Sequence, residues 1–373
     1  MRPRVTTMIG LICFSLFFFA AGPLKAATAP KGEGDASWKE LVAKAQKEGT
    51  VSIYVSAVPA AARTAVQQAF KKKYGINIEY TPASAGELVQ KFKTEMTAGL
   101  HLADVMHTGN TQFINLIGPL NVTVPLEPLL VLPEVTDPAK WRGGKLPFVD
   151  SEKHAIMAML LANNFYAINT DLVKANEIRS TLDLLHPKWK GKIIMQDPSV
   201  PGNGNDWFAF TTLNIMGAEK TDKFMLDLVK QEPAVTRDSR QLVEAVAQGK
   251  YPLGIGASVA QVVSFIESGA RVDFAKVNEP RQLSPGAGVI YTFKKVPHPH
   301  AAKLFINWFL SREGNAIYAP AHGYPPTRLD VSTDSFVPAL IPGPNDIVPT
   351  EEYMLKKGEL MAKSAKLFGN LRK

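Results

Sequence analysis

Apolar and polar positions alternate along the chain in a helix-and-strand order from residue 37 onward. Short apolar runs rich in β-branched residues predict buried strands, and amphipathic stretches bounded by Ser, Pro or Gly predict the helices between them. Ser37–Glu40 and Ser84–Glu87 both fit the capping-box pattern that opens a helix. The predicted strands are 51–55, 76–80 and 103–107, and the predicted helices are 37–49, 59–74 and 84–99. This βαβαβ order predicts a parallel sheet with helices on both faces.

A second set of alternating elements follows a proline-rich stretch, 118–150, which has no sustained period and predicts a packed surface excursion. The later predicted strands are 156–168, 192–196, 253–255, 272–275 and 288–293, and the later predicted helices are 205–216, 239–248, 258–268, 300–310 and 351–367. The pattern therefore predicts an α/β protein with two units.

The first 29 residues have the pattern of a secretory signal peptide. Arg2 and Arg4 precede an apolar stretch of about 14 residues, which is shorter than the ~20 that a membrane-spanning helix needs. Small residues at 26–29 suit cleavage there. The only cysteine, Cys13, lies in this segment, so we expect the exported chain to contain no disulfide, thiolate metal site or cysteine nucleophile.

Charge argues against nucleic-acid binding. The net charge is +8, but three basic residues lie in the first 29, which leaves 39 basic against 34 acidic residues. The densest basic run, Lys71–Lys73, falls at a predicted helix end, where cations suit the helix dipole. We therefore expect no nucleic-acid partner.

A resemblance to a known family covers about the whole exported chain. It rests on the order and spacing of segments 51–56, 70–76, 79–80, 87–99, 103–105, 166–170, 189–193, 197–198, 247–250 and 301–305. These segments resemble the periplasmic solute-binding proteins of ABC importers, in the ferric-iron-binding-like branch. The resemblance implies a two-lobe periplasmic-binding-protein fold (type II), each lobe a mainly parallel sheet flanked by helices, joined by two crossing strands.

The resemblance also implies a division of the chain and a function. It gives 1–29 as signal peptide, 30–163 and 277–329 as lobe 1, 164–276 as lobe 2, and 330–373 as a C-terminal helical tail. The expected protein is a monomer in the periplasm that closes on a small solute, delivers it to an inner-membrane ABC permease and catalyses no reaction.

One departure from the family concerns iron. Iron-binding members present two adjacent tyrosines near the start of a lobe-2 helix, whereas this chain reads Gly-Ile-Gly-Ala-Ser-Val at 254–259, and none of its nine tyrosines adjoins another. A small anionic organic solute is therefore the favoured ligand. Capture of ferric iron or a metal chelate remains the alternative.

The junctions between strands and helices are the candidate site, because open parallel sheets bind ligands beyond the carboxyl ends of their strands. Helix starts there offer unpaired N–H groups that favour carboxylate or phosphate oxygens. The candidate ligand-binding residues are Ser56, Ala57, Asn110, Asp197, Asn205, Trp207, Arg237, Ser239 and Ser258. Alternatively, Ser56, Ser239 and Ser258 merely cap their helices.

The loop 197–207 is the most unusual part of this candidate site. Gly202 and Gly204 allow close backbone approach, Asn205 offers a donor and an acceptor, and Trp207 offers a stacking face. A flexible turn with Trp207 buried under the helix is the alternative. Arg237 is expected to bind a carboxylate or phosphate in bidentate fashion, or else to form a salt bridge with Asp238 or another acid.

No metal site, cofactor or catalytic group is expected. His298-Pro299-His300 lacks the i, i+4 spacing of helical metal ligands and has no acid within it. The chain shows no Gly-x-Ser-x-Gly motif and no Ser/His/Asp spacing, so a secreted hydrolase or lyase is the weaker alternative.

Overall fold

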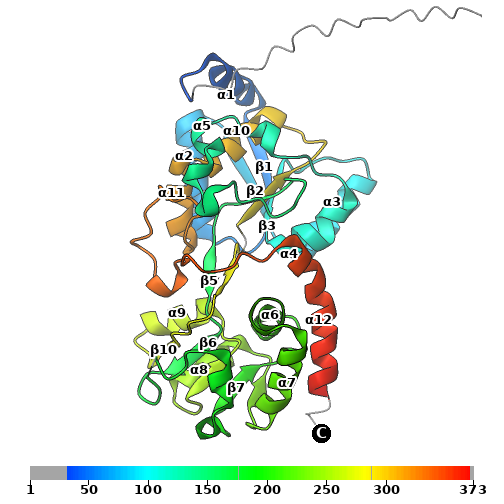
Figure 1. Ribbon diagram of the computed structural model, residues 1–373. Coiled ribbons are helices and arrows are strands. Elements are labelled where there is room, and N and C mark those ends of the chain that lie inside the picture. The colour runs from blue at the N-terminus through cyan, green and yellow to red at the C-terminus, as the bar shows by residue number, and fades with distance from the viewer. Residues whose placement is uncertain (1–31, 175, 287, 370–373) are drawn as a thin grey trace, which may run out of the picture.

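The computed structural model describes residues 32–369 except 175 and 287, and it contains two five-stranded sheets, one in each lobe (Figure 1). The signal-peptide prediction lies outside the described residues. In lobe 1 the strand order is β2-β1-β3-β12-β4. The bounds are β1 Thr50–Val55, β2 Asn77–Pro82, β3 Val105–Thr108, β12 Val289–Thr292 and β4 Ile156–Met157. Strand β1 is parallel to β2 and β3, whereas β12 is antiparallel to β3 and β4.

Helices from both ends of the sequence pack on the lobe 1 sheet. They are α1 Ala36–Glu48, α2 Ala60–Tyr74, α3 Ala85–Thr97, α10 Pro299–Leu310 and α11 Arg312–His322. Phe70 of α2 packs against Phe305 and Trp308 of α10, with ring centroids 5.6 and 5.2 Å apart. This aromatic contact joins α10, which lies where the chain comes back to lobe 1 after lobe 2, to the first βαβ unit.

Local signals in the sequence explain where these helices begin and end. Ser84 accepts a hydrogen bond from the N–H of Glu87 and Glu87 accepts one from the N–H of Ser84, so the capping box predicted for α3 is confirmed. Helix α2 ends at Gly75, whose φ of 74° suits glycine. The box predicted at Ser37 is wrong: Asp35 caps α1 instead, because its carboxylate accepts from the Ser37 N–H.

The sheet of lobe 2 has the order β10-β6-β9-β7-β8. The strands are β6 Tyr166–Asn169, β7 Ile193–Gln196, β8 Ala234–Thr236, β9 Leu253–Ile255 and β10 Val272–Phe274. The helices are α6 Asn203–Phe210, α7 Ala218–Val229, α8 Ser239–Ala247 and α9 Val259–Glu267. Strand β7 is parallel to β8 and β9, whereas β6 is antiparallel to β9 and β10, so the sheet is mixed rather than mainly parallel. The predicted α/β class, with two lobes whose sheets are flanked by helices, is confirmed.

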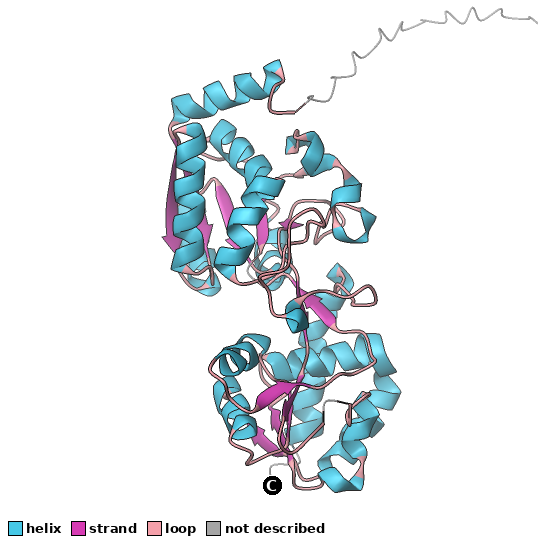
Figure 2. Ribbon diagram, turned by 90° about the vertical axis from the view of Figure 1, so that its left-hand side faces the viewer, coloured by secondary structure: helices cyan, strands magenta, loops and turns pink. Residues whose placement is uncertain are grey.

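Two antiparallel strands, β5 Leu161–Asn163 and β11 Gln282–Ser284, join the lobes and form the hinge (Figure 2). On the other side of β11, residues 330–350, which we call the C-terminal segment, add a β-bridge. The Leu283 N–H donates to Ile347 O and the Ile347 N–H donates to Arg281 O, at 2.7 and 2.9 Å. After this bridge the chain forms α12, Glu351–Gly369, which begins beside α4 (Asn110–Gln112) and runs along lobe 2 (Figure 1).

Several short helical turns fill the remaining connections. They are α4 Asn110–Gln112, the π-helical turns Phe113–Ile117 and Thr211–Met216, α5 Pro133–Thr136, and the 3₁₀ turns Gly118–Leu120, Glu127–Leu129, Pro138–Lys140, Arg142–Gly144, Thr181–Leu185, Pro187–Trp189 and Pro338–Leu340. Most of them lie in or near the proline-rich excursion, as its composition indicates. None of the helices in the described ranges is both long and apolar enough for a membrane span.

One predicted strand, 156–168, is wrong. It is three strands, β4, β5 and β6, which belong to lobe 1, the hinge and lobe 2 in turn. Asn164 helps to break the run, because its side chain donates to Ala275 O at 2.9 Å and accepts from the Tyr166 N–H at 3.2 Å. The lobe boundaries at 163/164 and 276/277 fall next to these hinge strands and stay predictions.

Candidate functional site

The parallel strands of both lobes end at helix starts that differ in how they are capped. Serine and aspartate side chains cap α3 and α8, which follow the edge strands β2 and β8. By contrast, the N-cap residues of α2, α6 and α9, which are Pro59, Gly202 and Ser258, make no side-chain cap in the described structure. In α6, however, the Gly204 N–H of the first turn donates to Gln196 Oε1 at 2.8 Å. Uncapped N–H groups and their partial positive charge are therefore found at the starts of α2 and α9, which follow the inner strands β1 and β9.

A cavity of about 180 Å³ lies between the lobes. Its wall combines the β3–α4 turn of lobe 1, Asp206 of α6, the hinge strand β11 and the C-terminal segment. The lining residues are Gly109, Asn110, Thr111, Gln112, Asp206, Gln282, Leu283, Ser284, Gly286, Pro349, Met354 and Lys357. Asn110 and Asp206 thus bring the two lobes to one space, which we call the interlobe cavity.

Helix α12 supplies the basic group of the interlobe cavity. The ammonium group of Lys357 is paired with the carboxylate of Asp206, and both side chains are about one-quarter exposed. Tyr353 accepts a hydrogen bond from Gln282 Nε2 at 2.9 Å and lies 3.4 Å from Asp206 O, to which its hydroxyl donates. Burial, together with the nearby Asp206 carboxylate, raises the pKa of Tyr353 well above its usual value. The phenol therefore stays neutral and acts as a hydrogen-bonding link between hinge and lobe 2.

The same helix contacts both lobes. On lobe 1, the Asn110 amide and the Thr111 hydroxyl lie 3.8 and 3.9 Å from Met354 Sδ, a weak polar contact. On lobe 2, Lys363 forms an ion pair of 2.7 Å with Asp222. The stronger contacts of α12 are therefore with lobe 2.

Asn205 of α6 and Arg237, which follows β8, both contact the loop before α6, where Asp197 lies. Asp197 is buried, accepts from the Ser199 N–H and hydroxyl at 3.0 and 2.5 Å, and accepts from Arg237 Nε at 3.1 Å. Asn205 is also buried, and its amide donates to Pro198 O at 3.2 Å. The Arg237 side chain is 63% exposed, so its guanidinium group keeps free donors while one N–H holds Asp197. A ligand contact for Arg237 stays a prediction.

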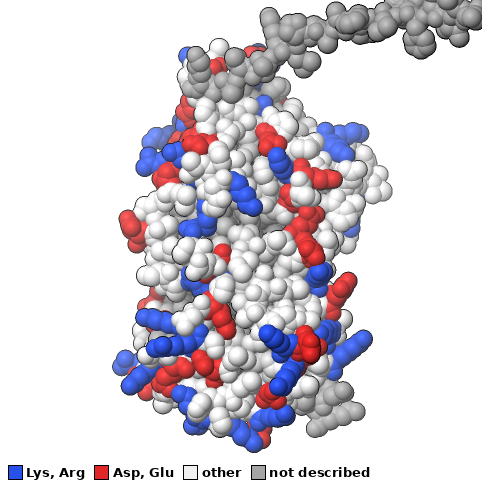
Figure 3. All heavy atoms as spheres, in the orientation of Figure 1, with Lys and Arg blue, Asp and Glu red and all other residues white. Residues whose placement is uncertain are grey.

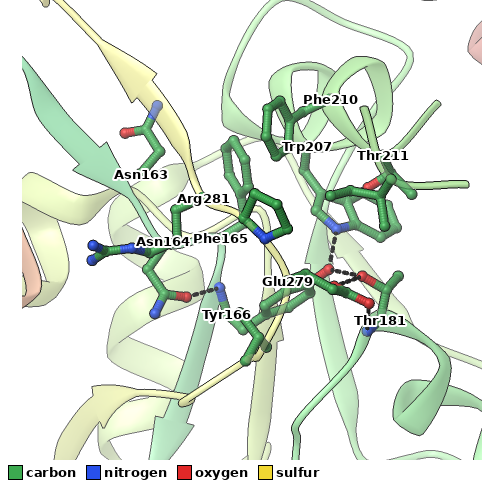
Figure 4. Close-up of a pocket in the computed structure, with 13 residues that line it drawn as sticks. Asn163, Asn164, Phe165, Tyr166, Thr181, Trp207, Phe210, Thr211, Glu279 and Arg281 are labelled. Atoms are coloured by element: carbon green, nitrogen blue, oxygen red, sulfur yellow. Dashed lines mark hydrogen bonds between the residues drawn. The ribbon is translucent and has the colours of Figure 1, made fainter. Parts of the chain in front are cut away.

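Trp207 lies in the core of lobe 2, 1% exposed, and its indole N–H donates to Tyr166 Oη at 2.8 Å (Figure 4). Tyr166 Oη lies 2.7 Å from Thr181 Oγ1, and the Thr181 hydroxyl donates to Glu279 at 2.5 Å. The space among these side chains is about 20 Å³, room for one water. This packing matches the alternative in which Trp207 is buried under its helix, and a stacking role stays a prediction.

The remaining predicted residues lie at other strand ends. Ser56 and Ala57 follow β1; Ser56 is buried and its N–H donates to His107 O at 3.1 Å, while Ala57 has a φ of 53°. Ser239 begins α8, and its buried hydroxyl has no partner among the described residues. Of the nine predicted residues, Asn110 alone lines the interlobe cavity as described, and the ligand-binding roles of all nine stay predictions.

Sequence reasoning missed the contribution of α12 and of the hinge. Lys357, Met354 and Ser284 line the interlobe cavity, and Tyr353 braces it. The helical pattern of 351–367 is visible in the sequence, but no spacing signal places that helix beside lobe 1.

Groups suited to direct metal coordination are scattered in the described part of the chain. No three His, Cys, Asp or Glu side chains within the described ranges gather as a metal-binding group. Burial raises the pKa of Tyr54, Tyr74, Tyr166, Tyr291 and Tyr318, which opposes formation of the tyrosinate that would bind ferric iron.

Comparison with known families identifies the chain. Residues 28–316, more than half of its length, match the family model described as bacterial extracellular solute-binding protein. The chain belongs to this family. It is the solute-binding component of an ABC import system and acts outside the cytoplasm.

Solved structures confirm the predicted likeness to the ferric-binding-like branch at the level of fold. IdiA (FutA) from Trichodesmium, described in complex with iron and citrate, is 18% identical, has a TM-score of 0.67, and covers 87% of this chain and 99% of its own. The Bordetella ferric binding protein is 18% identical with a TM-score of 0.66, covering 85% and 98%. AfuA from Actinobacillus pleuropneumoniae, described with fructose-6-phosphate, is 19% identical with a TM-score of 0.59, covering 86% and 99%.

Figure 3 shows the charged side chains on one face of the binding protein. Basic and acidic side chains are interspersed on both lobes on the face shown in Figure 3. This face has no continuous basic stripe of the kind that tracks a nucleic-acid backbone.

Proposed function

We propose that this binding protein captures a small anionic organic solute between its lobes and delivers it to an inner-membrane permease. The observation that carries the proposal is the interlobe cavity, where lobe 1, lobe 2, the hinge and the ammonium group of Lys357 meet. Beyond the wall of this cavity, the N-cap residues of α2 and α9 make no side-chain cap, which leaves partial positive charge at one helix start of each lobe. AfuA, which shares the fold, is described with a sugar phosphate, an anion of this class.

A bound solute favours closure of the lobes because it contacts both of them. Asn110 offers amide donors from lobe 1, and Asp206 of α6 forms the lobe 2 side of the cavity wall. Asp206 holds the Lys357 ammonium group at the cavity wall, where its remaining N–H groups can reach solute oxygens. A ligand shifts the lobes toward the closed form only as far as it binds that form more tightly.

The direct test is to identify the solute. Protein exported by a bacterial host and isolated gently is denatured, and the released small molecules are analysed by mass spectrometry. The proposal expects an organic phosphate or carboxylate in near-stoichiometric amount, which rebinds to refolded protein in calorimetry and is recovered unchanged after incubation. A neutral solute would contradict the ligand class, and a chemically altered one would contradict a purely binding role.

Ferric iron is the second candidate function, because IdiA (FutA) and the Bordetella protein share the fold and are described with iron or as ferric binding. Direct coordination by tyrosinate gives an intense visible charge-transfer band that a chelator abolishes. We expect the isolated protein to be colourless, with affinity for its solute unchanged after chelator treatment.

Export and oligomeric state complete the proposal. We expect cleavage of the first 26 to 29 residues on export to the periplasm, and a monomer in solution. Intact mass of the exported protein and light scattering test both points.

A further inference from the structure

A second cavity, of about 510 Å³, lies between lobe 1 and the C-terminal segment. Its wall is formed by the 142–150 part of the excursion, Met157 of β4, Leu160, Leu283 of β11, and residues 343–351. It shares only Leu283 and Pro349 with the interlobe cavity. Its size falls within the roughly 300–1,000 Å³ of small-molecule sites. We call it the strap cavity, after the segment that covers it.

The walls of the strap cavity are largely apolar. Phe148, Val149, Met157, Leu160 and Val348 line it, together with prolines of the excursion and of the C-terminal segment. Such a wall favours the apolar body of a ligand, because transfer of apolar surface from water is favourable.

Every acid on the wall already has donors. Asp150 accepts from the His154 and Ala155 N–H groups at 3.0 and 2.9 Å. Asp346 accepts from Arg281 and from the Gly343 N–H at 2.6 Å each. Glu351 accepts from the Ser151 N–H and hydroxyl at 3.1 Å.

Neither of the two basic side chains on the wall, Arg142 and Lys145, is paired with an acid in the described structure. Arg142 Nε is buried without a hydrogen-bond partner in the described structure, and burial lowers the pKa of Arg142 against the smaller opposing effect of the Asp346 carboxylate. Lys145 is exposed, and no described carboxylate forms an ion pair with either side chain. Because Nε is enclosed, an anion in the cavity would bind the terminal N–H groups of the guanidinium and supply the charged partner that Arg142 lacks.

We propose that the strap cavity is a second binding site, for an organic anion that combines a carboxylate with a compact apolar body. The carboxylate binds Arg142 and Lys145, and the apolar body lies against Phe148 and Met157. This inference goes beyond the proposed function, because the site lies outside the interlobe cavity and does not depend on the identity of the transported solute.

The test is a titration of the ligand-free exported protein with 4-(trifluoromethyl)benzoate, followed by ¹⁹F NMR. We expect saturable one-site binding, and binding at least tenfold weaker for the uncharged 4-(trifluoromethyl)benzamide. Arg142→Gln is expected to weaken benzoate binding about tenfold or more, the ordinary effect of losing a charged hydrogen bond. Val348→Trp, which fills the cavity and keeps both bases, is expected to abolish it.

Two control variants make the outcome decisive. Arg271→Gln removes an arginine from an exposed ion pair on lobe 2, and Lys357→Gln changes the interlobe cavity; both are expected to bind the probe as the wild type does. Equal affinity for benzoate and benzamide, unchanged binding in Arg142→Gln and Val348→Trp, or loss in Lys357→Gln would each overturn the proposal. Thermal unfolding of each variant shows whether it is folded. A failed titration would overturn the strap-cavity proposal without contradicting the proposed solute site in the interlobe cavity.

Discussion

The guanidinium group of Arg281 lies 2.6 Å from the carboxylate of Asp346, which ties the C-terminal segment to the hinge strand β11. Arg281 also donates to Ala339 O and Ile341 O at 2.8 and 3.0 Å. Burial alone would raise the pKa of Asp346, but the bonds from Arg281 and from Gly343 hold that pKa below its ordinary value. The hinge therefore carries a third, ion-paired segment in addition to its two strands.

Replacing Asp346 with Asn is expected to lower the free energy of unfolding by about 2 kcal/mol, because a charged hydrogen bond to a mostly buried arginine is lost. Urea denaturation measures this change, and limited proteolysis reports release of the C-terminal segment. Asp334→Asn is the matched control, since Asp334 lies exposed on the same segment and bonds only to nearby Ser332 in the described structure. Equal stability of the two variants would contradict the anchoring role.

Replacing Lys357 with Gln is expected to weaken binding of the co-purified anionic solute about tenfold, because a charged donor leaves the interlobe cavity. Calorimetry measures the affinity. Lys363→Gln is the control, since Lys363 also pairs with a lobe-2 acid, Asp222, but does not line that cavity. Equal weakening in both variants would mean that Lys357 acts through the placement of α12 alone.

Stability is expected to fall as the pH drops below about 6.5, because His107 is buried neutral in the folded protein. Burial and nearby His322 lower the pKa of His107 to about 3, whereas the unfolded chain takes up its proton near 6.5. The unfolded state then binds more protons, so acid favours unfolding, and His107 alone contributes about 2 kcal/mol at pH 5. Burial lowers the pKa of His322 to about 4, so His322 acts in the same direction. Denaturation of wild type and His107→Gln at pH 7.5 and 5.0 measures this. The same loss in both proteins would contradict the assignment to His107.

Gly204 is expected to tolerate no side chain. A Cβ there would lie 2.3 Å from Gln196 O, so Gly204→Ala must push α6 away from β7 and cost about 3 kcal/mol. Gly358→Ala is the matched control: it lies exposed in α12 with no described atom within 4 Å of the new Cβ, and it should add about 0.5–1 kcal/mol. Thermal or urea unfolding of both variants tests the contrast, and a neutral Gly204→Ala would contradict the close approach.

Local chemistry made much of the fold predictable. The run from Val51 to Val55 is rich in β-branched residues and mostly buried as β1, and α2 ends where Gly75 allows a positive φ. The helix α11 was missed for an equally local reason. It contains Gly314, which fits tightly against Trp308 O, and Pro320 in its last turns, and both residues weaken a helical pattern.

The candidate site was less predictable because it depends on how distant parts of the chain meet. The position of Asn110 on the wall of the interlobe cavity follows from its place after a parallel strand, which is a topological rule, and its ligand-binding role stays a prediction. Lys357 reaches the same cavity from about 250 residues later, through packing of α12 on α6. The partner of Arg237 is Asp197, 40 residues away, rather than the adjacent Asp238, which caps α8. Sequence spacing carries no signal for such pairs.

Closure of the lobes on the solute is the central claim, and a distance measured between the lobes tests it most directly. Cys13 is the only cysteine and lies in the signal segment, so spin labels can be placed at Gln68→Cys on α2 and Lys223→Cys on α7, both exposed positions. Pulsed electron resonance with and without the co-purified solute should show the inter-label distribution moving to shorter distances in proportion to occupancy. A distribution that stays the same at saturating solute would contradict the account.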